Sequence, residues 1–376
     1  SANGEVACLL MVSCNSRGGA LYLDVLGVNI EESTFENNQA ISLSQQIFAQ
    51  GGAIFSSNLF LDGNNELYST KIKECSFVKN FATGTGGALY VQNQKLVVSN
   101  SRFLNNRVAT ENLYFTDSAS QGGAIWYSSS ATTSGSMTDS IFEGNVASSG
   151  WGGAVYGSNT VKPFTIKGCR FYHNIAMSSF TNKAQGGAIM VAQTFSLVIE
   201  QCEFFENVVL PHLNIYPRTY SGFGGALFIQ TASLTITGSN FTRNFALTGQ
   251  FDAGSAGGAI VLENASPVVI VATYFGYNGA SGFFGYSTFS QPGTAGAIYI
   301  KFSSANITDH CLFEFNWASA GGSAPAVGGA LGIYFDQSSV SRSASAAYEG
   351  INIMSSTFLS NYALPQLCIE KGIQSS

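Results

Sequence analysis

Charge is scarce in this chain. Only 10% of its 376 residues are Asp, Glu, Lys or Arg, and 22 acidic residues against 16 basic ones give a net charge of −6. The basic residues are scattered along the sequence, which argues against nucleic acid or an anionic membrane surface as a partner. No apolar run reaches about 18 residues, the length that a membrane-crossing helix needs, so we expect no transmembrane helix.

Sequence signatures of metal and nucleotide sites are also missing. The seven cysteines and three histidines form no CxxC pair and no Cys/His spacing of the kind that holds zinc. Neither a GxSxG element nor a phosphate-binding glycine loop is present. We therefore expect no cofactor and no metal.

Glycine, by contrast, is abundant, with 42 residues, and much of it lies in one recurring triplet. A Gly-Gly-Ala triplet followed by an aliphatic residue begins at Gly18, Gly51, Gly86, Gly122, Gly152, Gly186, Gly224, Gly257 and Gly328, and an Ala-Gly-Ala variant begins at Ala295. Successive triplets lie 30 to 38 residues apart. A fixed period of this length is the signature of a solenoid.

A second motif follows every triplet: a small residue, then x-Phe-x-x-Asn. Its phenylalanines are Phe35, Phe77, Phe103, Phe142, Phe171, Phe204, Phe241, Phe275, Phe313 and Phe358. Its asparagines are Asn38, Asn80, Asn106, Asn145, Asn174, Asn207, Asn244, Asn278, Asn316 and Asn361. We expect the phenylalanines to stack as a buried column. An inward amide at a turn can bond to the amides above and below it, so the asparagines are expected to form a structural ladder.

The type of secondary structure follows from residue chemistry, since helical repeats share this period. Segments such as LVVSNS, LVIEQC and LTITGS are rich in Val, Ile and Thr and alternate with period two, as strands do. The sequence thus predicts an all-β parallel β-helix of about ten coils with three strands each: the segment after GGA, the middle segment and the Phe segment. The inward middle-strand positions are Ile30, Ile72, Val98, Met137, Ile166, Ile199, Ile236, Ile270 and Ile353, and Ile307 is one residue out of step. The glycines are expected to provide positive φ or close backbone approach at a corner.

The paired GGA(I/L/V) and FxxN motifs resemble the repeats of the chlamydial polymorphic outer-membrane proteins. The resemblance covers residues 18–363 and implies a right-handed β-helical passenger domain, associated with adhesion at the cell surface. We accordingly expect a β-helix over residues 18–363, an N-terminal cap or partial coil over 1–17 and a tail over 364–376. The opening SANGEVACLL lacks the charged start of a signal peptide, so a processed chain or a segment of a longer one is expected.

The second residue after each GGA forms a largely aromatic row. It reads Tyr22, Phe55, Tyr90, Trp126, Tyr156, Met190, Phe228, Val261, Tyr299 and Gly332. Alternation along a strand turns this row away from the core. Either loops or a neighbouring subunit cover the row, or it is a strip that stacks on sugars or a partner, with Trp126 and Tyr156 as candidate contacts. Phe283, Phe284 and Tyr286 lie on a Gly-rich loop and are further candidate partner contacts.

Cysteines and sequons suggest covalent modifications. Cys8 and Cys14 are a candidate disulfide in the N-terminal cap. Four other cysteines replace serine at the small position before Phe, where we expect buried thiols, and a Cys169–Cys202 bridge is the less favoured alternative. Asn240, Asn264 and Asn306 begin Asn-x-Ser/Thr triplets and are candidate N-glycosylation sites.

The function expected from these patterns is structural. Polysaccharide cleavage needs carboxylates that neighbouring coils project onto one face, whereas Asp24, Asp139 and Asp252 fall at different coil positions. We therefore expect an extracellular or cell-surface, non-catalytic, adhesin-like protein. Since neither terminal segment looks like a charged cap, exposed edge strands favour self-association into a fibre or filament. A carbohydrate-binding surface module is the alternative, and a polysaccharide-active enzyme is a distant one.

Overall fold

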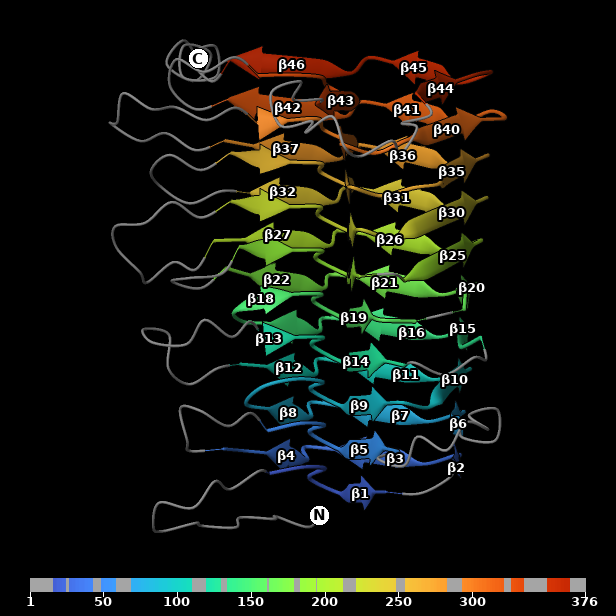
Figure 1. Cartoon of the computed structure of the whole chain (residues 1–376). Helices are drawn as coiled ribbons and strands as arrows, with labels where there is room; N and C mark the ends of the chain where they lie inside the picture. The colour runs from blue at the N-terminus through green and yellow to red at the C-terminus, as the bar shows by residue number, and fades with distance from the viewer. Residues whose placement is uncertain are drawn as a thin grey trace, which may run out of the picture.

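The computed structural model describes residues 16–24, 27–42, 49–58, 69–109, 120–129, 134–160, 162–178, 183–193, 195–211, 221–247, 254–282, 293–320, 326–334 and 350–365. In these segments the chain forms strands and no helices. The strands stack in coils along one axis, with the first coil and the last at opposite ends of a rod (Figure 1). We number the coils 1 to 10 by their Gly-Gly-Ala or Ala-Gly-Ala triplet and name the sheets A to E.

Two ten-stranded parallel sheets follow each triplet. Sheet B contains β1 (Leu21–Leu23), β5 (Ile54–Ser57), β9 (Leu89–Gln92), β14 (Ile125–Ser128), β19 (Val155–Ser158), β24 (Ile189–Ala192), β29 (Leu227–Gln230), β34 (Ile260–Glu263), β39 (Ile298–Lys301) and β43 (Leu331–Tyr334). Sheet C contains β2 (Gly27–Glu31), β6 (Ser69–Lys73), β10 (Lys95–Ser99), β15 (Ser136–Thr138), β20 (Phe164–Lys167), β25 (Ser196–Glu200), β30 (Ser233–Thr237), β35 (Val268–Val271), β40 (Ala305–Thr308) and β44 (Ile351–Ile353).

Two more ten-stranded sheets flank the asparagine of each coil. Sheet D carries the phenylalanines and contains β3 (Thr34–Glu36), β7 (Ser76–Val78), β11 (Arg102–Leu104), β16 (Ile141–Glu143), β21 (Arg170–Tyr172), β26 (Glu203–Phe205), β31 (Asn240–Thr242), β36 (Tyr274–Gly276), β41 (Leu312–Glu314) and β45 (Thr357–Leu359). Sheet E contains β4 (Gln39–Ala40), β8 (Phe81–Ala82), β12 (Arg107–Val108), β17 (Val146–Ala147), β22 (Ile175–Met177), β27 (Val208–Leu210), β32 (Phe245–Leu247), β37 (Gly279–Ser281), β42 (Trp317–Ala320) and β46 (Tyr362–Pro365).

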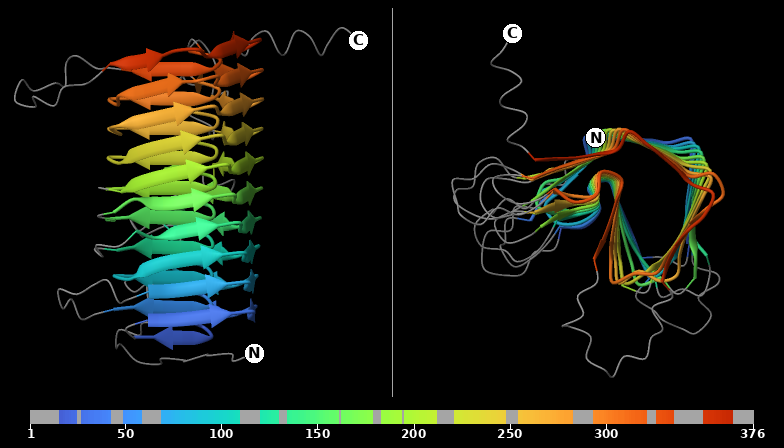
Figure 2. Two further views of the ribbon diagram at one scale, coloured as in Figure 1. Left: turned by 90° about the vertical axis from the view of Figure 1, so that its right-hand side faces the viewer. Right: turned by 90° about the horizontal axis from the view of Figure 1, so that it is seen from above.

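A fifth sheet lies directly before the triplets. Sheet A contains β13 (Ser120–Gln121), β18 (Gly150–Trp151), β23 (Ala184–Gln185), β28 (Gly222–Phe223), β33 (Ser255–Ala256) and β38 (Gly293–Thr294), and isolated bridges at Arg17, Gln50, Thr85 and Val327 extend it to both ends. Seen along the axis, the coils superimpose, and the stretches leading to and from the loops on one side form an arm that projects from the main ring (Figure 2). The structure is therefore the predicted parallel β-helix of ten coils.

The prediction of three strands per coil is wrong. The backbone after each asparagine continues as sheet E, and the backbone before each triplet pairs as sheet A, so a coil has four or five paired segments. Both extra segments are two to four residues long and lie beside loops of variable length, which hides their period in the sequence.

The core contains the predicted columns. The ten phenylalanine rings stack with centroids 4.6 to 5.1 Å apart. The middle-strand row is in register, and Ile307 pairs with Ile270 and Ile353. Its extra residue is absorbed in the turn, where Asp309 and His310 both have positive φ.

The two glycines of the triplet have different roles. Gly186 has a φ of +64°, a conformation that favours glycine. A Cβ on the next residue, Gly187, would lie 2.0 Å from the carbonyl oxygen of Gly225 and 2.7 Å from the amide nitrogen of Val208. Positive φ and close backbone approach therefore both occur at this corner, as expected.

Candidate functional site

The aromatic row of sheet B does turn away from the main core, but it is not an exposed strip. Tyr156, Met190, Phe228 and Val261 form a second hydrophobic cluster, with Trp126 and Tyr299 packed against it. Phe55 and Tyr90 are also buried, whereas Tyr22 in coil 1 is 50% exposed. Of the two alternatives for this row, the structure shows cover at Tyr156, which is buried, whereas Trp126 is half-buried.

Sheet A provides the cover for this row. The indole Nε1 of Trp126 donates a hydrogen bond of 2.8 Å to Oε1 of Gln121 on β13. The ring centroid of Trp151 on β18 lies 6.1 Å from that of Tyr156. Arg17 lies over the ring of Phe55 at 4.9 Å. Residues before the triplets thus cover the aromatic row along a seam between sheets A and B. The cover comes from the chain itself, whereas the sequence also allowed cover by a neighbouring subunit.

The seam opens into a groove in coils 6 to 10. Its volume is about 510 Å³, within the range typical of ligand pockets. Its floor includes small, buried side chains: Ala256 of sheet A and Val261 of sheet B stand where the preceding coil has Phe223 and Phe228. In the last coil Gly332 is the residue that pairs with Tyr299.

Aromatic and charged groups line the groove. Phe223 and Phe228 lie at one end, and Tyr299 and Tyr334 lie toward the other. Burial raises the pKa of Tyr299 to about 12, with smaller contributions from Tyr334 and the nearby carboxylate of Glu263. Tyr299 is thus uncharged at neutral pH and presents a ring face and a hydroxyl group.

Three charged side chains complete the lining. The Nζ of Lys301 lies 2.5 Å from Oε1 of Glu263, and Gln230 donates to Oε2 of the same carboxylate at 3.1 Å. The Nζ of Lys183 lies 5.4 Å from the ring centroid of Phe223, and it forms no ion pair with any residue that the structure describes. The sequence shows that the aromatic row is interrupted at Val261 and Gly332. It does not reveal sheet A, which forms the other wall of the groove.

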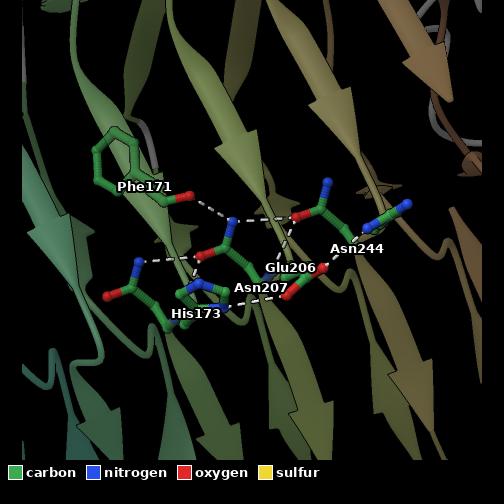
Figure 3. Close-up of polar contacts among 7 residues, drawn as sticks. Phe171, His173, Glu206, Asn207 and Asn244 are labelled. Atoms are coloured by element: carbon green, nitrogen blue, oxygen red, sulfur yellow. Dashed lines mark hydrogen bonds and ion pairs between the residues drawn. The ribbon is translucent and has the colours of Figure 1, made fainter. Parts of the chain in front are cut away.

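The ladder asparagines lie in one column at the corner between sheets D and E. From coil to coil, Nδ2 of each donates to Oδ1 of the next at 2.9 to 3.0 Å. In Figure 3, Asn207 also donates to the carbonyl oxygen of Phe171, at 2.8 Å. The residue before each ladder asparagine has positive φ, which turns the asparagine inward. The column is therefore part of the scaffold.

Charged residues on the outer side of this corner pair with one another. Nδ1 of His173 lies 3.3 Å from Oε2 of Glu206, and Arg243 lies 3.4 Å from Oε1 of the same residue. Figure 3 shows His173 and Glu206 beside the ladder. These are solvent-exposed pairs of small energy. Over the described segments, no group of three or more His, Cys, Asp or Glu side chains is arranged to hold a metal ion.

The remaining candidate residues fall into two groups. Asn240, Asn264 and Asn306 are exposed on the outer surface, a position that a glycosylated residue requires. Cys75, Cys169, Cys202 and Cys311 are buried free thiols, so the Cys169–Cys202 bridge is not formed. Cys8, Cys14, Phe283, Phe284 and Tyr286 lie outside the described residues.

Comparisons with known proteins agree with the fold. Residues 153–364 match the family model of the right-handed β-helix region, and residues 74–92 and 139–158 match the Chlamydia polymorphic membrane protein repeat. Over 200 residues the chain is 28% identical to a probable outer membrane protein, pmp6, of Chlamydia pneumoniae. The aligned part is 50% of this chain and 13% of that relative, so the chain spans a small part of its length.

A solved structure is also similar, at a low level. It is the crystal structure of the periplasmic alginate epimerase AlgG, with a TM-score of 0.31 and 10% identity, covering 88% of this chain and 74% of that one. A likeness of this size carries no functional argument. Within the described segments, no helix is long and apolar enough to cross a membrane.

Proposed function

This chain belongs to the right-handed β-helix family, and from this premise we propose that it is a non-catalytic structural module that stacks end to end with copies of itself. The extracellular or cell-surface location expected from the sequence agrees with the outer-membrane name of its chlamydial relative. With strands about 4.8 Å apart, ten coils form a rod about 48 Å long. In this proposal the rod acts as a stiff spacer with an adhesin-like surface role.

The observation that carries the stacking proposal is the direction of the asparagine ladder. Each ladder asparagine donates from its backbone N–H and from Nδ2 to Oδ1 of the next coil. Of the described residues, none donates to Oδ1 of Asn38 in coil 1, and none accepts from the backbone N–H of Asn361 in coil 10. Among the described residues the ladder therefore runs from an acceptor in coil 1 to donors in coil 10.

These two ends complement each other in one orientation. Asn361 of one copy can donate to Oδ1 of Asn38 in the next, and Nδ2 of that Asn38 can donate its second hydrogen to the carbonyl oxygen of Phe358. Two like ends would bring together the Asn361 donors of two copies or the Oδ1 atoms of two Asn38 residues, and neither pairing continues the ladder. The contact is thus heterologous and head-to-tail, the kind that builds filaments when the rotation does not close a ring.

Apolar side chains support the same contact. In coil 10, Ile353 is 39%, Phe358 42% and Tyr362 45% exposed, whereas Ile307 and Phe313, which precede the first two in the neighbouring coil, are fully buried. A further coil on this end would cover them and extend the phenylalanine stack. Burying each such side chain contributes about 1.5 to 3 kcal/mol.

The experiment is sedimentation velocity over a concentration series. Asn361→Asp keeps an oxygen that accepts from Asn316 and removes the Nδ2 donors, and its charge opposes stacking. We expect the parent to form species that grow with concentration and the variant to remain monomeric with an unchanged circular dichroism spectrum. Lys71→Gln, on the outer face of sheet C, is the matched control. Equal association by the parent and Asn361→Asp would refute end-to-end stacking.

A further inference from the structure

We propose that the groove between sheets A and B in coils 6 to 10 is a binding site for an oligosaccharide that carries carboxylate groups. This goes beyond the structural role proposed above, because it assigns a ligand to the side of the rod. The site lies on the sheet B side of the seam and uses neither end coil's ladder groups. Binding and stacking can therefore be tested separately.

The shape of the groove favours an extended ligand. Its lining residues come from five successive coils, beginning with Lys183 and ending with Tyr334. Four steps between coils correspond to about 19 Å along the axis. A small compact molecule would leave most of this length empty, whereas a short chain lying parallel to the axis would fill it.

The lining chemistry favours a sugar chain. Sugar rings have C–H faces that pack on aromatic rings and hydroxyl edges that need donors and acceptors. Phe223 and Tyr299 are half-buried in the lining, and Gln185 and Thr294 add polar groups to it. Both walls of the seam are parallel sheets whose strands are already hydrogen-bonded to one another. Little of the site has to become ordered on binding, which lowers the conformational cost.

The charge of the groove favours carboxylates on that chain. Lys301 is neutralised by Glu263, but Lys183 is exposed and has no ion-pair partner in the described part of the chain. The described residues of the lining therefore carry an excess of one positive charge, although the whole chain has a net charge of −6. A carboxylate on the ligand would give Lys183 a charge-assisted hydrogen bond, and complementarity of this kind supplies specificity.

The test is calorimetric titration with two probes of equal length, a hexamer of galacturonate and neutral cellohexaose. We expect saturable binding of the acidic hexamer, weaker binding at high salt and no detectable binding of the neutral one. Lys183→Gln should weaken binding about tenfold, equivalent to about 1.4 kcal/mol. Lys71→Gln, on sheet C, is the matched control and should bind like the parent.

A second variant tests the groove itself. Ala256→Phe with Val261→Phe refills the seam with the residue type that closes the preceding coil, and should abolish binding while leaving the circular dichroism spectrum and the sedimentation behaviour unchanged. Binding to neither hexamer, equal binding to both, binding that survives refilling, or binding unchanged in Lys183→Gln would each overturn the proposal. Loss of end-to-end association in Asn361→Asp, with binding retained, would separate this site from the stacking contact.

Discussion

Asn207 donates a hydrogen bond from Nδ2 to Oδ1 of Asn244, 37 residues further along the chain, at 3.0 Å. The same Nδ2 donates to the carbonyl oxygen of Phe171 at 2.8 Å, and the Oδ1 of Asn207 accepts from the backbone N–H and Nδ2 of Asn174. One side chain thus connects three successive coils. Because the contact is fully buried, water cannot replace its partners.

Asn207→Ala should therefore be strongly destabilising. It removes the Nδ2 donor to the carbonyl oxygen of Phe171 and the acceptor of the Asn174 backbone N–H and of one Nδ2 hydrogen of Asn174, whose Nδ2 keeps its bond to Phe142. Each buried unsatisfied group costs about 1 to 3 kcal/mol. We expect a loss of at least about 3 kcal/mol in urea unfolding followed by circular dichroism. Asn29→Ala, at an exposed position on β2, is the control and should change stability by less than about 0.5 kcal/mol. Similar losses in both variants would contradict the ladder's role.

The phenylalanine column predicts a difference between inner and terminal coils. Phe204 is fully buried between Phe171 and Phe241, with centroids 4.8 and 4.6 Å away, whereas Phe358 stacks on one side and is 42% exposed. Phe204→Ala should cost about 3 to 5 kcal/mol, and Phe358→Ala should cost clearly less in monomeric protein. The comparison is made from urea midpoints at low protein concentration. Equal losses of stability in the two variants would contradict a stabilising contribution from stacking on both faces of the Phe204 ring.

Gly187→Ala should prevent the chain from folding normally. The added methyl group would lie 2.0 Å from the carbonyl oxygen of Gly225, and the atoms around it are backbone, so no side chain can move aside. Gly350→Ala is the control, because nothing lies within 4 Å of its Cβ position. We expect insoluble or partly unfolded protein from Gly187→Ala and native protein from Gly350→Ala. A folded, soluble Gly187→Ala protein would contradict the close approach of coils 6 and 7.

Stability should fall at alkaline pH through Tyr127. Burial raises the pKa of its hydroxyl group to about 12, from an ordinary value of 10. The unfolded chain therefore loses this proton first, so the contribution is fully present below pH 10 and is lost as the pH rises toward 12. For this side chain the linkage amounts to about 2 to 3 kcal/mol. Tyr127→Phe should show a shallower decline in urea stability over that window, and an unchanged decline would exclude Tyr127 as a source.

The repeating core could be predicted from the sequence because its signals recur in every coil. Ile72, Phe77 and Asn80 have the same spacing in most repeats, and each has a single physical role, as an inward aliphatic residue, a stacked ring and a buried amide respectively. Chemistry that is common to all ten coils can be read from one sequence. The fold, its number of coils and its inward columns follow from these residues alone.

The seam and the groove could not be predicted in the same way. Their outer wall consists of Gln121, Trp151, Phe223 and Thr294 in successive or nearby coils, and these residues share neither polarity nor size. They belong to strands of two residues beside loops of different length, so no period marks them. For this reason the burial of Tyr156 becomes evident only when sheet A is seen to lie against sheet B.

Electron microscopy of the chain at near-physiological salt tests the central claim most directly. If coils 10 and 1 of successive copies stack through Asn361 and Asn38, filaments should form with an axial repeat of about 48 Å. All subunits in a filament should point the same way, and Asn361→Asp should give only dispersed rods. Dispersed single rods of the parent chain at high concentration, or paired rods related by a two-fold axis at their ends, would contradict head-to-tail stacking.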